Sequence, residues 1–294
     1  METQFETVST FGCAILFCFL LLIAPTMGYA KEQFFESAGV LIRFVDEGKG
    51  APVVLIHGLT GSAGNWTENG AMPRLSEQFR AIALDCRGHG RSGKPHDPTA
   101  YGKQMIRDVV QLLDFLKIED AHIIGYSMGA EIALRLVTVY PERVRSLIIG
   151  GSGWSGSFEA ETYTRLADSL VKNGSIGPAL RWVNANSPVG PFPAPTDEQI
   201  TKIDELFLSQ QDGEALAAVM GSMRDIVNLS KEEVAAIHVP VLGITGENDM
   251  ERRNLERMGE VMPRFTLKIL AGKDHMEAYM DPQFTDSIID FLKK

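Results

Sequence analysis

Cysteine is scarce in this chain, which has three among its 294 residues: Cys13, Cys18 and Cys86. The first two lie within an apolar N-terminal run, so a chain that has lost that run keeps Cys86 alone and can form no intramolecular disulfide. The stability of such a chain must come from a hydrophobic core, and a chain of this length can build one.

Sequence patterns for metal and nucleotide binding are missing too. The chain has no C-x-x-C pattern and no H-x-x-x-H pattern, and its carboxylates are not clustered at the spacing of metal ligands. It has no P-loop motif and no complete dinucleotide-binding fingerprint. We therefore predict no metal site and no cofactor.

Basic residues are outnumbered, because 28 Lys and Arg face 38 Asp and Glu and give a net charge of -10. Nucleic acids are bound mainly through Lys and Arg side chains that neutralise phosphates. A chain with this excess of acid has no electrostatic reason to bind them, so we expect a small molecule as the ligand and no nucleic acid partner.

The N-terminal segment, residues 1–30, contains a continuous apolar run from Phe11 to Ala24. Fourteen residues are few for a membrane span and typical of the core of a signal peptide. Small residues at Gly28 and Ala30 suit cleavage after Ala30, but residues 1–10 lack the usual basic residue, so an uncleaved membrane anchor stays open. We expect export through this segment, to the periplasm, the medium or a membrane-anchored state.

The remaining chain alternates strand-like and helix-like segments. Several apolar runs show no polar alternation, which is typical of parallel strands covered by helices on both faces. The predicted strands cover 40–45, 53–56, 81–84, 121–124, 144–149, 239–244 and 265–270, and the predicted helices between them cover 71–78, 102–116 and 130–140. This order predicts an α/β fold with a mostly parallel, doubly wound sheet.

Residues 152–230 break the alternation, because they contain helical patterns and no strand pattern. Helices are predicted over 162–171, ending at Asn173-Gly174, over 196–209, beginning with the capping box Thr196 to Gln199, and over 214–226. A last short helix begins at Ser230. We therefore predict a core formed by 31–151 and 231–294, with a helical insertion over 152–230.

The sequence Gly125-Tyr126-Ser127-Met128-Gly129 joins a predicted strand to a predicted helix. This is the context of a G-x-S-x-G nucleophile elbow, where a sharp turn exposes the serine and the flanking glycines relieve steric crowding. The helix then begins beneath the serine with free N–H groups at its positive end. The pattern predicts Ser127 as a nucleophile.

A serine needs a base, and the base needs an acid that orients it. Asp249 lies in the loop after the predicted strand 239–244, and His275 lies in the loop after 265–270. The carboxyl ends of parallel strands gather functional groups at one edge of a sheet. We predict Asp249 as the acid, ahead of Glu247, and His275 as the base among six histidines.

Four motifs together resemble the α/β-hydrolase superfamily, and in particular capped, esterase- or lipase-like serine hydrolases. They are His57-Gly58-Leu59-Thr60, the segment from Asp85 to Ser92, the serine elbow, and the two acid and base loops. The resemblance implies that the backbone N–H groups of Leu59 and Met128 form the oxyanion hole. It also implies that the helical insertion is a cap that covers the active site.

The expected function is hydrolysis of carboxylic esters or related acyl compounds through an acyl-enzyme on Ser127. The alternatives are a carbon–carbon bond hydrolase, a cofactor-free perhydrolase with the same triad, or a non-catalytic receptor on this fold. Ser127, in place of an Asp, argues against epoxide hydrolase and dehalogenase chemistry, since those relatives within the superfamily use a carboxylate nucleophile. Trp154 and Met223 are predicted to line an apolar pocket, and Glu131 is open between a solvated or ion-paired helix residue and a residue of the site.

Overall fold

A computed structural model of the chain describes residues 32–154, 156–186, 195–208 and 211–294. Its centre is an eight-stranded sheet in the order β1-β2-β4-β3-β5-β6-β7-β8. The strands are β1 (Gln33–Ser37), β2 (Val40–Gly48), β3 (Pro52–Ile56), β4 (Arg80–Leu84), β5 (Ala121–Tyr126), β6 (Val144–Gly150), β7 (Val241–Gly246) and β8 (Phe265–Leu270). β2 pairs antiparallel with β1 and β4, and all other pairs are parallel.

Successive residues of each central strand enter two different cores, one on each face of the sheet. In β3, Val54 and Ile56 pack into one hydrophobic cluster, whereas Val53 and Leu55 pack into the other. Both clusters are closed to solvent, which explains why the apolar runs show no polar alternation. The predicted α/β architecture with a mostly parallel sheet is confirmed.

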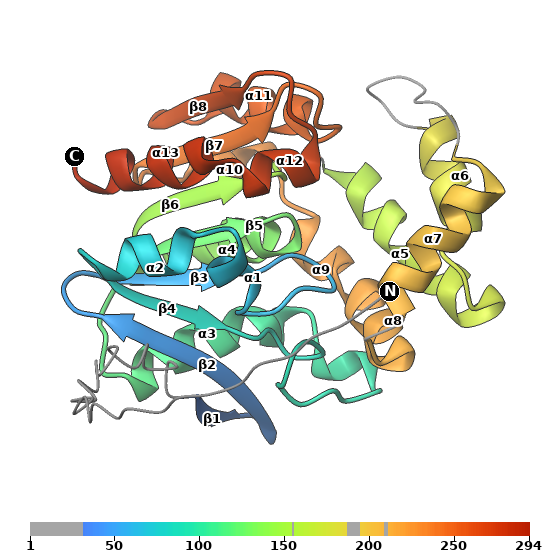
Figure 1. Cartoon of the computed structure of the whole chain (residues 1–294), viewed down its shortest axis with the longest axis horizontal. Coiled ribbons are helices and arrows are strands. Elements are labelled where there is room, and N and C mark those ends of the chain that lie inside the picture. Colours follow the sequence, from blue (N-terminus) through green and yellow to red (C-terminus); the bar gives the residue numbers. More distant parts are fainter. Residues whose placement is uncertain (1–31, 155, 187–194, 209–210) are drawn as a thin grey trace, which may run out of the picture.

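Helices cover the two faces (Figure 1). One face carries α3 (Lys103–Phe115), α4 (Met128–Val139) and α11 (Arg252–Val261), and the other carries α1 (Asn65–Glu68), α2 (Ala71–Ser76), α12 (His275–Met280) and α13 (Pro282–Leu292). Two short 3₁₀ turns lie at Pro98–Ala100 and Pro141–Arg143.

Among the described residues, only helices lie between β6 and β7. They are α5 (Ser157–Asn173), α6 (Gly177–Asn186), α7 (Asp197–Leu208), α8 (Gly213–Ser222), α9 (Arg224–Val227) and α10 (Lys231–Ala235). In Figure 1 the parallel strands point toward the side of the molecule where α5 to α8 lie. The helical insertion, here called the cap, therefore lies at the carboxyl edge of the sheet.

The helix predicted over 214–226 is divided into α8 and α9 at Met223. The Ser222 hydroxyl donates a hydrogen bond to the Val219 carbonyl and accepts one from the Gly102 N–H, at 2.7 and 3.0 Å. A serine that bonds back to its own helix competes with the helical pattern, which accounts for the break. The sequence prediction did not include the strand β1 or the helices α1, α6, α11, α12 and α13.

The predicted signal peptide or membrane anchor, residues 1–30, lies outside the described residues. Within the part of the chain that the structure describes, no helix is both long enough and apolar enough to cross a membrane.

Candidate active site

Ser127 occupies a strained turn between β5 and α4. Its φ of 53° and ψ of -122° lie in a region that side chains rarely adopt. A Cβ atom added to Gly125 would lie 2.1 Å from the Gly129 carbonyl oxygen, and one added to Gly129 would lie 2.1 Å from the Ile56 oxygen. Both glycines are therefore required by close packing, and the predicted elbow geometry is present.

Asp249 and His275 meet at the same edge of the sheet. The His275 Nδ1 atom lies 3.1 and 3.2 Å from the two carboxylate oxygens of Asp249, whose side chain is fully buried. An Nδ1–H that donates to this carboxylate leaves Nε2 free to accept a proton. Burial lowers the pKa of His275, but the hydrogen bond and charge of Asp249 outweigh it, together with Glu251 and Asp274, and raise that pKa above its ordinary value.

Tyr126, which precedes Ser127 in the chain, connects the serine turn to the histidine. Its hydroxyl donates a hydrogen bond to the His275 carbonyl, and the two rings lie 5.2 Å apart. A Cβ atom on Gly151 would approach the His275 ring to 2.8 Å, and the Ser127 N–H donates to the neighbouring Gly150 carbonyl at 2.8 Å. The ends of β5 and β6 thus surround the histidine.

Glu247 and Asp274, which flank Asp249 and His275 in the chain, have structural contacts of their own. The Glu247 carboxylate accepts a hydrogen bond from the Gly272 N–H at 2.8 Å. Asp274 caps α12 by accepting from the N–H groups of Met276 and Glu277, in a capping box. Of the acids weighed for the role, Asp249 alone has a described hydrogen bond to His275.

The other histidines have different partners. His89 is buried and bonds the Arg87 carbonyl, His96 pairs with Asp212 and Glu214 on the surface, and His122 bonds the Ser146 hydroxyl. The His238 backbone carbonyl accepts a hydrogen bond from the Arg264 side chain.

His57 has a fixed tautomer. Its Nε2 atom accepts a hydrogen bond from the Cys86 N–H at 2.9 Å, so the ring proton lies on Nδ1, 2.7 Å from the Gly58 carbonyl oxygen. Burial lowers the pKa of His57 and keeps it neutral.

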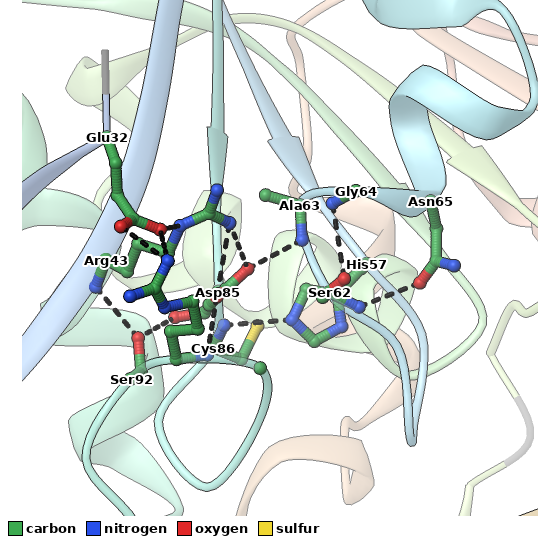
Figure 2. Close-up of polar contacts among 12 residues, drawn as sticks. Glu32, Arg43, His57, Ser62, Ala63, Gly64, Asn65, Asp85, Cys86 and Ser92 are labelled. Atoms are coloured by element: carbon green, nitrogen blue, oxygen red, sulfur yellow. Dashed lines mark hydrogen bonds and ion pairs between the residues drawn. The ribbon is translucent and has the colours of Figure 1, made fainter. Parts of the chain in front are cut away.

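The loop after β3 carries Leu59 and is held by a buried carboxylate (Figure 2). The Asp85 side chain accepts hydrogen bonds from the N–H groups of Ala63 and Arg91, both at 2.7 Å, and pairs with Arg43 at 3.2 Å. Gly58 packs against the serine, since an added Cβ would lie 3.3 Å from the Ser127 Cβ. These contacts fix the loop beside the nucleophile, as an oxyanion donor at Leu59 requires.

The predicted pocket residues lie where the cap meets the core. Trp154 is partly buried, its indole N–H donates to the Leu229 carbonyl at 2.9 Å, and the Arg257 guanidinium lies 4.8 Å from its ring centre. Met223 is fully buried at the break between α8 and α9. Their role in substrate binding stays a prediction.

Glu131 is neither solvated nor ion-paired among the described contacts. It is 6% exposed and accepts hydrogen bonds from Ser152 and Tyr163. The sequence signal was an acid one helical turn after the serine, among the apolar residues at the start of α4. Nothing in the sequence pointed to a role for Tyr163, because its contact with Glu131 forms only when α5 packs beside α4 in the folded protein.

Comparison with known proteins agrees with this architecture. The sequence model of the protein family described as "alpha/beta hydrolase fold" matches residues 51–170 of this chain. The chain is 26% identical over 274 residues to a putative 2-succinyl-6-hydroxy-2,4-cyclohexadiene-1-carboxylate synthase from Bacillus subtilis, covering 87% of this chain and 96% of that protein. Over 117 residues it is 38% identical to 2-hydroxymuconate semialdehyde hydrolase from a Pseudomonas strain, covering 40% of this chain and 41% of that enzyme.

Solved structures extend the similarity to almost the whole fold. A hydrolase from Pseudomonas aeruginosa superposes with a TM-score of 0.71 at 22% identity, covering 90% of this chain and 99% of its own. The chain thus has the α/β-hydrolase fold, and its residues 51–170 match the model of the family that is named for this fold. The superfamily hosts many reactions, so the substrate must be argued from the site.

Proposed function

We propose that this protein is a serine hydrolase that cleaves carboxylic esters or related acyl compounds. The observation that carries the proposal is the strained Ser127 turn at the same sheet edge as the Asp249–His275 pair. A strained backbone at an exposed serine is expected where the turn serves function. The Asp249–His275 hydrogen bond supplies the oriented base that a serine needs.

The proposed reaction begins when Ser127 Oγ attacks the acyl carbonyl carbon and its proton passes to His275 Nε2. Negative charge then develops on the carbonyl oxygen, where the N–H groups of Leu59 and Met128 would donate hydrogen bonds. Each such donor contributes about 3–4 kcal/mol in measured enzymes. His275 returns the proton to the leaving alcohol, and an acyl-enzyme remains on Ser127.

Water completes the proposed cycle. His275 takes a proton from the water that attacks the acyl-enzyme, and the acid is released as Ser127 regains its proton. Asp249 holds the imidazole in one tautomer and stabilises its protonated form throughout. Ser127 thus loses its proton to the leaving alcohol in the first half of the cycle and receives a proton from water in the second half.

The second candidate is a carbon–carbon bond hydrolase with the same three residues. It is favoured by the 38% local identity to the enzyme that is named for 2-hydroxymuconate semialdehyde. The two candidates predict the same nucleophile and differ in substrate, so a substrate panel separates them.

The test uses the purified full-length protein, a fluorophosphonate probe and a panel of esters, lactones, amides and vinylogous 1,5-diketones. We expect covalent labelling of Ser127 and ester turnover, and Ser127→Ala should abolish both. Ser287→Ala, a serine in α13 that bonds the Gln283 carbonyl, is the matched control and should behave as the native protein does. Unchanged ester hydrolysis in Ser127→Ala would refute the assignment, and labelling without any turnover would favour a receptor.

We also propose that residues 1–30 direct export. The support is the apolar run from Phe11 to Ala24 and the small residues at Gly28 and Ala30. Mass spectrometry of the native protein should find an N-terminus at Lys31 in the exported fraction. An intact Met1 in the membrane fraction would favour the anchor, and a cytosolic full-length protein would contradict both forms of the proposal.

A further inference from the structure

Glu131 connects three elements around the nucleophile. It lies one turn into α4, and its N–H donates to the Ser127 carbonyl at 3.2 Å. One carboxyl oxygen accepts a hydrogen bond from Ser152, which follows β6, at 3.1 Å, and the other accepts one from Tyr163 of the cap helix α5, at 2.7 Å. All three side chains are at least nine-tenths buried. The Glu131–Tyr163 bond thus ties the cap to the serine helix.

The surroundings of this carboxyl group are acidic. The charge of Glu251, which precedes α11, raises the pKa of Glu131, and the charge of His275 lowers it. The charge of Glu131 in turn raises the pKa of Glu159 in α5. Among the described residues, no Lys or Arg pairs with Glu131, and no group of acids and histidines is placed to hold a metal ion. A buried carboxylate without a counter-ion is costly, so the group is expected to be uncharged at neutral pH.

We propose that Glu131, as a neutral carboxylic acid, is a positioning residue that holds cap helix α5 over Ser127 through its hydrogen bond with Tyr163. In this form one carboxyl oxygen bears the proton and the other accepts from Tyr163. This inference rests on the proposed hydrolase function for its kinetic consequences, but the state of the carboxyl group can be measured without turnover.

Ionisation should loosen this junction. Burial, followed by the charge of Glu251, raises the pKa of Glu131 to about 8, although the bonds from Tyr163 and Ser152 oppose that rise. Above that pH the carboxylate is repelled by Glu251 and favours contact with water. The cap is then held less firmly, so activity should fall on the alkaline side of the pH profile as Glu131 loses its proton.

The decisive experiment compares Glu131→Gln, Tyr163→Phe and Glu142→Gln, the last being an exposed acid of the 3₁₀ turn at Pro141–Arg143. Gln keeps the shape and hydrogen bonds of the neutral acid but cannot ionise. Infrared difference spectra between about pH 7 and about pH 9.5 should show the loss of a carboxylic acid C=O band in the native protein. We expect that band to be weaker in Glu131→Gln than in the native protein and unchanged in Glu142→Gln. Burial also raises the pKa of Glu159, so the contribution of Glu131 is read from the difference between Glu131→Gln and the native protein.

The kinetic arm measures kcat and KM for a nitrophenyl ester across the same pH range. The native alkaline limb should lie near pH 8, and Glu131→Gln should remove it while changing kcat/KM at neutral pH less than about threefold. Tyr163→Phe should move the limb to higher pH, because the lost bond had favoured the carboxylate, and should raise KM more than it lowers kcat.

Each outcome has one meaning. A native alkaline limb that persists in Glu131→Gln, or an infrared band that is as strong there as in the native protein, overturns the inference while Ser127 labelling still supports the hydrolase. Absence of turnover and labelling overturns the proposed function, and the infrared band then decides the state of Glu131 by itself.

Discussion

The Tyr126 hydroxyl group donates a hydrogen bond to the backbone carbonyl of His275, although the two residues are 149 positions apart. Tyr126 lies directly before the nucleophile at the end of β5, and His275 begins α12 after β8. Burial raises the pKa of Tyr126, so its hydroxyl stays protonated and able to donate. One side chain thus fixes the base loop relative to the serine turn.

Removal of this bond should slow catalysis without weakening binding. We expect Tyr126→Phe to lower kcat about 2- to 10-fold with KM nearly unchanged, since one neutral hydrogen bond contributes about 0.5–1.5 kcal/mol. Steady-state kinetics on one ester, with Ser127 labelling as the check on folding, measure this. An effect on KM alone would show that Tyr126 does not position the base.

The acid role can be separated between two neighbouring side chains. Asp249→Asn should lower kcat by orders of magnitude, roughly 10⁴-fold in a well-studied triad, because the imidazole loses its tautomer. Glu247→Gln alters only a bond to the Gly272 N–H and should cost less than about tenfold. Both variants should keep the thermal unfolding midpoint near that of the native protein, and the reverse ranking of rates would assign the acid to Glu247.

The pH dependence on the acid side follows from the histidine. His275 acts as a base only when neutral, and its pKa is raised, so the acid limb of kcat/KM should lie above pH 6.5. Glu251→Gln removes one of the negative charges that raise this pKa, and it should move the limb to lower pH by less than about one unit. A native limb below pH 6.5 would contradict this account of the base.

Substrate preference should depend on the cap rather than on the triad. Trp154→Ala and Met223→Leu should change the relative rates among acyl chain lengths while leaving Ser127 labelling intact. Leu is used at Met223 because truncating a fully buried side chain to Ala costs about 2–5 kcal/mol of stability. Val171→Ala, on the exposed side of α5, is the matched control. An unchanged preference in both test variants would mean that other residues select the substrate.

Several elements could be predicted from the sequence because their causes are local. Apolar or alternating runs marked seven of the eight strands, and the capping boxes at Thr196 and Ser230 marked the starts of α7 and α10. The strand β1 was missed because its residues QFFES mix apolar and polar types. The helix α6 was missed because its Gly177-Pro178 start resembles a loop. The helices α1, α11, α12 and α13 were missed as well.

By itself the sequence determined the turn at Ser127, because it supplies glycine at positions 125 and 129, where no larger residue fits. It also placed Asp249 and His275 after strands that end at one edge of the sheet. Only the tertiary structure decided which distant groups meet there. Tyr126 reaches His275, Tyr163 reaches Glu131, and Asp85 holds the loop at Ala63. These contacts depend on how helices and strands far apart in the chain pack together, and no periodicity or spacing along the chain records that packing.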